Sequence, residues 1–342
     1  MKRLMTILIV CFIACGLLVS KAQGKQNQSK QTVEADTTAT DTTLDVIAYF
    51  AKGDTCDYWI SETKWKINGK DTIKTADIAT KIRLVVTDST ATGYKMNYTF
   101  MDIDNDTTTN SLEAKLANAI AERVGKTVIG TTIEFETDEY GTITKIHNLS
   151  QIKKQAKTLF KDCIKDLANM PEMKFMKELG FDISDISKNV STDELVEGYV
   201  EELKDLFFCH GNTYKIGETE EHEDATENSY ESDSNRSVSI DEDGNYTIQG
   251  EVISVIPQSD IKALLSGFVG ALNKNKSISE NFEKEFDSQV NVDAKNSSWF
   301  AISCYPDGWP YEVIKQNKVK LGDLEKVSQT HIEECYFSHI KK

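Results

Sequence analysis

The side chains with the clearest potential for chemistry are the oxygen-bearing ones between positions 102 and 113. Carboxylate, hydroxyl and amide oxygens are the ligands that Ca²⁺ prefers, and one loop can gather several of them around an ion. Counted from Asp102, oxygen-bearing residues occupy positions 1, 3, 5 and 9, and a glutamate occupies position 12. The candidate calcium ligands are Asp102, Asp104, Asp106, Thr108, Asn110 and Glu113.

This spacing resembles the calcium-binding loop of EF-hand proteins. The EF-hand pattern has glycine at position 6 and an aliphatic residue at position 8, where this chain has Thr107 and Thr109. A predicted strand, rather than a helix, precedes the loop. In the alternative interpretation the segment is an acidic connection, and Asn110 and Glu113 form a capping box for a helix predicted over residues 111–124. Calcium is the one cofactor that the sequence suggests.

Two further groups of residues could bind a ligand. Trp59 and Trp65 have the same parity on a predicted strand, so they share one face and could form a stacking platform for a sugar or a lipid. The alternative is that both belong to the core. His331, Cys335 and His339 are spaced four apart and could ligate zinc, but no fourth ligand is near them in the sequence. The alternative there is a buried cysteine flanked by surface histidines.

Catalytic motifs are missing from the sequence. It contains no G-x-S-x-G, no HExxH and no glycine-rich phosphate loop. Cys209 and His210 are sequence neighbours, so their side chains are expected to point apart. A pair of carboxylates that hydrolyses a glycosidic bond remains open, because acidic residues are frequent and nothing singles out two of them.

The cysteines do not form the dense framework of a small disulfide-rich domain. Beyond the first 22 residues they are odd in number, widely spaced and without a CxxC pair. One bridge is possible, with Cys304 and Cys335 as the first choice, and Cys163 falls on an apolar helix stripe. The five residues are Cys56, Cys163, Cys209, Cys304 and Cys335.

The N-terminal residues have the pattern of an export signal. Lys2 and Arg3 precede an uncharged apolar run, and small residues follow at the cleavage position, so residues 1–22 are interpreted as a cleaved signal peptide. Cleavage would leave no stable membrane span, and the mature chain is expected in the periplasm or outside the cell. Lipidation at Cys15 is the alternative. Residues 23–43 are polar and aperiodic, which is typical of a disordered linker.

The charge of the chain excludes some partners. It carries 39 basic and 55 acidic residues, a net charge of −16. Removing residues 1–22 removes three basic residues, and 36 − 55 leaves −19. Such a chain repels phosphate backbones, so nucleic acid is not an expected partner.

The periodicity predicts hairpins interspersed with amphipathic helices. Residues 131–170 are interpreted as strand, turn, strand and helix, and Asn148 is the expected helix N-cap. Residues 237–272 repeat that order of elements. Gly125 is expected to end the helix over 111–124, and residues 191–194 form a strong capping box. The predicted fold is α+β: a large curved antiparallel sheet with helices on one face, in two similar halves over residues 44–210 and 211–342, which could be one continuous domain.

The order of elements resembles that of uncharacterised secreted proteins of Gram-negative envelopes and, more distantly, the lipoprotein-carrier architecture. The resemblance implies a hydrophobic cleft between sheet and helices. The leading hypothesis is therefore an exported, non-enzymatic binding protein for an apolar or envelope-derived ligand, with an envelope protein as another possible partner. The alternative is a structural or interaction protein with a filled core, and a carboxylate-based hydrolase is the third possibility.

Overall fold

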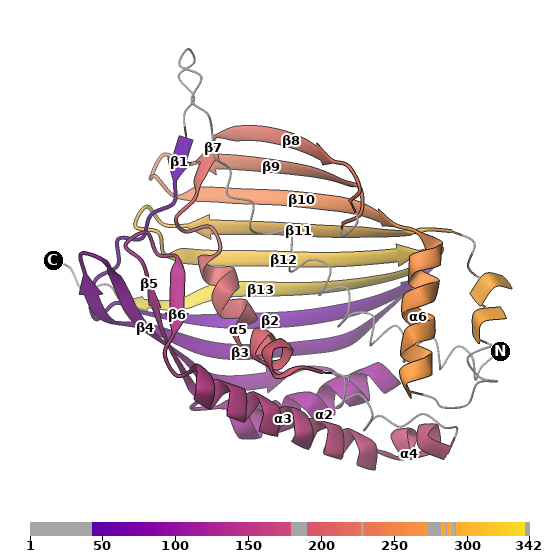
Figure 1. Cartoon of the computed structure of the whole chain (residues 1–342). Helices are drawn as coiled ribbons and strands as arrows, with labels where there is room; N and C mark the ends of the chain where they lie inside the picture. Colours follow the sequence, from indigo (N-terminus) through magenta and orange to yellow (C-terminus); the bar gives the residue numbers. More distant parts are fainter. Residues whose placement is uncertain are drawn as a thin grey trace.

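The computed structural model describes residues 43–178, 190–226, 229–272, 282–284, 286–288, 290 and 292–338. Its main feature is one eleven-stranded antiparallel sheet in the order β6-β5-β4-β3-β2-β13-β12-β11-β10-β9-β8 (Figure 1). The sheet has two edges, β6 and β8, and is therefore open. The short strands β1 (Thr43–Asp45) and β7 (Thr213–Lys215) pair separately. The predicted signal peptide, Cys15 and nearly all of the predicted linker lie outside the described residues.

The chain builds the sheet from its middle outward and then from the far edge inward. It runs from β2 to the edge strand β6, crosses to β8 at the opposite edge, and returns to β13, which pairs with β2. Residues of both predicted halves therefore lie in one sheet. The first five long strands are β2 (Thr55–Asn68), β3 (Asp71–Thr90), β4 (Gly93–Asn105), β5 (Thr132–Thr137) and β6 (Ile143–Ile146). The others are β8 (Gly217–Glu223), β9 (Ser232–Ile240), β10 (Tyr246–Ile256), β11 (Ala294–Cys304), β12 (Pro310–Leu321) and β13 (Leu324–Ser338).

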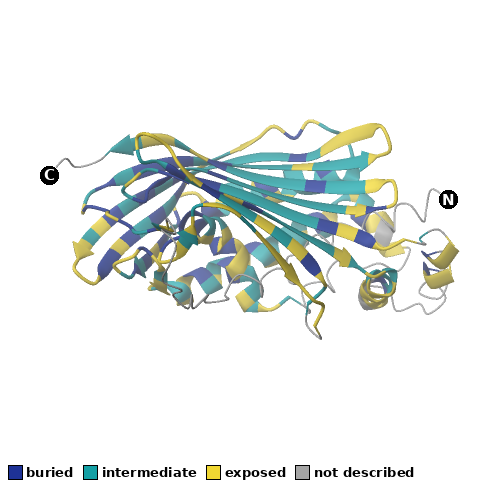
Figure 2. Ribbon diagram, turned by 90° about the horizontal axis from the view of Figure 1, so that it is seen from above, coloured by how far each residue is buried: buried dark blue, intermediate teal, exposed yellow. Residues whose placement is uncertain are grey.

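The helices lie on one side of this sheet (Figures 1 and 2). They are α2 (Leu112–Val128), α3 (Leu149–Asn169), α4 (Pro171–Glu178), α5 (Thr192–Phe207) and α6 (Gln258–Leu272). The α+β prediction is confirmed. In the part of the chain that the structure describes, no helix combines the length and the apolar character needed to cross a membrane.

A predicted turn and a predicted helix cap are both present. Gly69 has φ +59°, the left-handed conformation that the Asn68-Gly69 turn between β2 and β3 requires. The capping box of α5 has both of its bonds: the Glu194 amide donates to Ser191 Oγ at 3.2 Å, and the Ser191 amide donates to Glu194 Oε2 at 2.8 Å.

The start and end of α2 were predicted wrongly. Its N-cap is Ser111, whose Oγ accepts from the Ala114 amide at 3.1 Å, so Asn110 and Glu113 do not form a capping box. The helix continues past Gly125, because packing against the sheet outweighs the cost of about 1 kcal/mol for a helical glycine. Val128 is buried at the last helical position.

Asn148 precedes α3 as predicted, but its side chain does not cap the helix. The Asn148 side chain holds the start of the helix against β5 instead. Its Nδ2 donates to the carbonyl of Thr132 at 2.8 Å, and its Oδ1 accepts from the amide of Glu134 at 3.1 Å. The residue therefore joins strand to helix.

The main core lies between the helices and the face of the sheet toward them, which we call the inner face. Cys56, Tyr58 and Ile60 of β2 point to this face, and Ile152 of α3 and Leu206 of α5 pack in the same cluster. Buried residues concentrate toward one end of the strands, where these helices lie (Figure 2). The opposite side, the outer face, is covered by none of the described helices.

The second strand–turn–strand–helix unit repeats the first in its order of elements but not in its packing. Helix α3 contributes to the main core through Ile152 and Leu159. Leu265 and Val269 of α6 pack instead with Phe282 and Phe286 in a separate small cluster. Only the first unit therefore places its helix in the core of the sheet.

Candidate functional site

Three of the four tryptophans lie on the outer face. Side chains alternate along a strand, and Ile60 and Ile302 point inward, so Trp59 and Trp65 of β2 and Trp299 of β11 point outward. All three are half-buried. Only Trp309 is a core tryptophan, with none of its surface exposed. Trp59 and Trp65 therefore share a face as predicted, and they do not belong to the core.

Strand register places Trp65 and Trp299 on one continuous surface. Trp65 lies opposite Val327 of β13, which lies opposite Lys318 of β12. Trp299 lies opposite Gln316, which is two residues from Lys318 on the same face of β12. Three strand spacings and two residues along the strand separate the Cα atoms of the two tryptophans, which is about 16 Å in a regular sheet.

The surface near the tryptophans is polar and internally bonded. Between Trp299 and β2, Gln316 Nε2 donates to Gln329 Oε1 at 3.3 Å. Beside Trp59, the Nζ of Lys81 lies 6.0 Å from the ring centroid. Asp57, 3% exposed, accepts two bonds from Arg83, at 2.7 and 2.9 Å. These bonds hold the charged neighbours of Trp59 in place.

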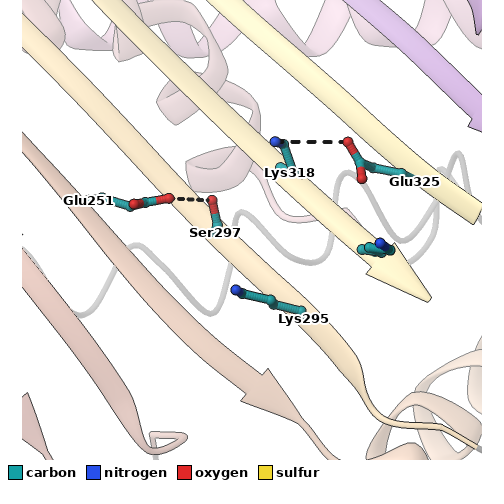
Figure 3. A pocket seen from close by; sticks show the side chains of 6 residues that line it. Glu251, Lys295, Ser297, Lys318 and Glu325 are labelled. Carbon is teal, nitrogen blue, oxygen red and sulfur yellow. Dashed lines mark hydrogen bonds and ion pairs between the residues drawn. The ribbon is translucent and has the colours of Figure 1, made fainter. Parts of the chain in front are cut away.

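A hollow of about 280 Å³ opens on the outer face over strands β10 to β13, and Figure 3 shows the side chains that line it. Lys318 sits in the row of Trp65, and Ser297 lies two residues from Trp299 on the same face. The hollow, which we call the lysine hollow, is lined by Glu251, Lys295, Ser297, Lys318, Lys320 and Glu325. Ser297 Oγ donates to Glu251 Oε1 at 3.0 Å, and Lys318 Nζ lies 3.9 Å from Glu325 Oε1.

A second hollow, of about 250 Å³, lies between α2 and α3, and its charges are paired with one another. Arg123 Nε donates to Asp166 Oδ2 at 2.6 Å, and Lys126 pairs with Glu122. A ligand would have to break these pairs, so this hollow is the weaker candidate.

The inner face holds a group of carboxylates beneath α5. Lys315 of β12 donates to both oxygens of Asp205, at 2.7 and 2.8 Å. Burial, together with the nearby carboxylate of Glu62, raises the pKa of the half-buried Glu202 to about 8. Tyr98 Oη is buried beside this group and has no hydrogen-bond partner among the described residues. The protonated form of Glu202 is therefore favoured at neutral pH.

This pKa makes stability depend on pH with a definite sign. The pKa of Glu202 in the folded chain is above its ordinary value of 4.5, so its contribution to stability is complete below pH 4.5 and is lost as the pH rises through 8. Glu202→Gln, which mimics the protonated form, is expected to be more stable than the wild type at high pH, by about 2 kcal/mol after allowance for partial exposure.

The measurement is urea unfolding at pH 5 and pH 8.5. Glu197→Gln, on the same helix but solvent-exposed and paired with Lys204, is the control and is expected to show no such gain. Equal stability of Glu202→Gln and the wild type at both pH values would contradict the assignment.

The candidate calcium ligands do not converge. Asp102 and Asp104 lie on the outer face of β4, where each caps the amide of the next residue, at 2.9 and 2.8 Å. Asp106, Thr108 and Asn110 follow in the connection to α2, and Glu113 pairs with Lys66 at 3.5 Å on the inner face. Within the described ranges no three His, Cys, Asp or Glu side chains form a group that could hold a metal ion. Calcium binding stays a prediction.

The five cysteines, all within the described residues, are free thiols, so the bridge between Cys304 and Cys335 is not formed. Cys304 is buried, whereas Cys335 sits at a bulge of β13, where it is exposed and its thiol donates to the Asp57 carbonyl at 3.4 Å. His331 pairs with Glu312 at 2.9 Å, and His339 lies outside the described residues.

Cys209 and His210 are both buried and have structural roles. His210 Nε2 is 2.9 Å from the carbonyl of Gly308, and burial lowers the pKa of this imidazole to about 4. Burial raises the pKa of the Cys209 thiol, which removes its nucleophilic form at neutral pH. The pair is therefore unsuited to nucleophilic catalysis.

Comparisons with models of protein families and with curated protein sequences find no match. Among solved structures, a chain from a structure of lipid–protein interactions in lipovitellin is similar with a TM-score of 0.39 and 8% sequence identity. The similarity covers 86% of this chain and 26% of that one, so this chain spans about a quarter of that protein. At this level the likeness carries no conclusion about function.

Proposed function

We propose that this protein is an exported, non-enzymatic binding protein whose ligand, an oligosaccharide of the cell envelope, lies across the outer face of the sheet. The observation that carries the proposal is the position of Trp59, Trp65 and Trp299. All three point away from the core and remain partly open to solvent. A folded chain gains more from a tryptophan by burying it, so three on one exposed face favour a role in binding.

The chemistry of this face suits a sugar. The flat faces of indole rings can stack on the C–H faces of pyranose rings, while hydroxyl groups need hydrogen-bond partners close to the rings. Gln316 and Gln329 supply amide groups between Trp299 and β2. The span of about 16 Å between Trp65 and Trp299 fits an extended oligomer better than a single small molecule.

The packing of the interior favours a ligand on the outer face over one between sheet and helices. Tyr58, Tyr98 and Phe135 are at most 1% exposed and belong to one core that also contains residues of α3 and α5. Both hollows described above lie at the surface and are lined mainly by charged side chains. An apolar ligand between sheet and helices would have to displace packed side chains.

Export is the part of the proposal that rests on sequence alone. A basic start, an apolar run and small residues near position 22 support a cleaved signal peptide. An exported protein meets envelope polysaccharides, which makes the two parts of the proposal consistent.

The test is isothermal titration calorimetry of the mature chain against two classes of probe. Cello-, chito- and malto-oligosaccharides and their acidic derivatives form the first class, and dihexanoylphosphatidylcholine is the apolar probe. We expect saturable binding of at least one oligosaccharide and none of the lipid. Binding of the lipid with no heat from any oligosaccharide would contradict the proposal and favour an apolar ligand between sheet and helices.

A further inference from the structure

We infer that the lysine hollow binds an acidic group of the ligand, so that the oligosaccharide recognised on the outer face is an anionic one. This inference rests on the proposed function and specifies the class of its ligand. The acidic group is a carboxylate, sulfate or phosphate carried on the sugar chain.

The first observation is a pair of like charges in direct opposition. Lys295 of β11 and Lys320 of β12 are register partners on the outer face, and Glu325 of β13 is the register partner of Lys320 on its other side. Like charges directly opposite each other on one face of a sheet destabilise the pairing of the strands. An anion between the two ammonium groups would reverse that effect, because each then has an opposite charge close by.

The second observation is that each acidic residue of the hollow already has a partner within it, and neither is in an ion pair with Lys295 or Lys320. Three lysines face two glutamates, which leaves a charge of +1. Glu251 accepts from Ser297, and Glu325 is paired with Lys318. Lys295 and Lys320 have no ion pair among the described residues, although acidic residues outnumber basic ones by 55 to 39 in the chain.

The third observation is continuity with the tryptophans. Lys318 lies in the same row of residue pairs as Trp65, and Lys295 and Lys320 form the next row. Lys295 is also four residues from Trp299 on the same strand face. A sugar chain stacked on either ring and extended along this face would therefore bring an acidic substituent within reach of the lysines.

The hollow also selects ligands by charge. The rest of the chain is strongly acidic and repels anions at long range, so a local group of lysines is needed to retain an acidic sugar. Because Lys295 and Lys320 are exposed, this attraction is screened by salt. We therefore expect the preference for an acidic ligand to disappear at high ionic strength.

The experiment compares matched ligands and matched variants. The oligosaccharide that binds most tightly in the calorimetric panel is used in two forms. One form is neutral, and the other is oxidised at C6 to the uronate. We expect the wild type to bind the acidic form more tightly, by roughly three- to tenfold for two exposed ion pairs. Lys295→Gln/Lys320→Gln is expected to abolish this preference while it retains the neutral form.

The control variant is Lys95→Gln/Lys145→Gln. These two lysines are register partners of Glu136 on the outer face near the β6 edge, so the change in charge and the face are the same. The control is expected to keep the preference for the acidic form. Equal affinity of the wild type for neutral and acidic ligands would overturn the inference and leave the proposed function standing.

Two other results would also overturn the inference. In the first, no oligosaccharide binds, whereas free sulfate ion binds to the wild type and not to Lys295→Gln/Lys320→Gln. That result would contradict the proposed function as well. The other is a dimer in analytical ultracentrifugation that the same double variant dissociates. In that case a second copy of this acidic chain would occupy the hollow.

Discussion

Trp309→Ala is expected to lower the free energy of unfolding by about 3–5 kcal/mol, the cost of removing a large aromatic side chain from a packed core. Trp309 has no exposed surface, and its ring centroid lies 4.3 Å from that of Phe50 and 5.7 Å from that of Phe337. Neither neighbour can fill the space without leaving other core contacts. Urea unfolding followed by circular dichroism measures the loss.

The region around Trp309 joins distant parts of the chain, which is why its loss is expected to be global. The amide of Tyr49 donates to the carbonyl of Asp307 at 2.9 Å, and His210 Nε2 bonds to Gly308. Gly308 has φ +86°, and a Cβ there would lie 2.6 Å from the carbonyl oxygen of Ile47. The start of the fold, the end of α5 and the β11–β12 turn therefore meet at this point.

Trp299→Ala is the matched control for Trp309→Ala. Both remove an indole, but Trp299 is half-buried on the outer face. Its cost in stability is expected to be below about 1.5 kcal/mol, since less surface is buried and solvent can fill the space. Equal losses for the two variants would mean that the outer face is packed like a core.

Trp65→Ala/Trp299→Ala is expected to weaken oligosaccharide binding by about 100-fold or more, because an aromatic anchor in an interface contributes about 2 kcal/mol when truncated. The two residues lie at the ends of the surface that includes the lysine hollow. Affinity is measured by calorimetry with the oligosaccharide that binds the wild type, and unfolding curves establish that the double variant is folded.

The control for binding is Tyr140→Ala, which removes an exposed aromatic side chain from the turn between β5 and β6. It is expected to leave the affinity unchanged. Unchanged affinity in Trp65→Ala/Trp299→Ala would show that the ligand does not stack on these rings.

Local signals in the sequence were sufficient for the elements and for part of the site. The Asn68-Gly69 turn, the capping box at Ser191 and the helical stripe of α3 each follow from neighbouring residues, and each is present. The shared parity of Trp59 and Trp65 follows from strand geometry alone. The start of α2 was misplaced by one residue, because Asn110 and Ser111 are both good N-cap residues and tertiary contacts decide between them.

The rest of the site depends on strand register, which local patterns do not determine. Strand alternation alone could have placed Trp299 on a face of its strand. Its position near Trp65 follows from the strand order β11-β12-β13-β2, which forms only after the chain has crossed from one edge of the sheet to the other. The opposition of Lys295 and Lys320 is likewise a matter of register. The calcium prediction relied on spacing along a loop, whereas Asp102 and Asp104 lie in an extended strand.

The most direct test of the central claim is a proton–nitrogen NMR spectrum of the four tryptophan indole groups, each assigned by a single tryptophan-to-phenylalanine variant. On addition of the oligosaccharide that binds in calorimetry, we predict that the indole signals of Trp65 and Trp299 shift and that of Trp309 does not. A shift of the Trp309 signal alone, with the outer tryptophans unchanged, would place the ligand in the interior and contradict binding on the outer face.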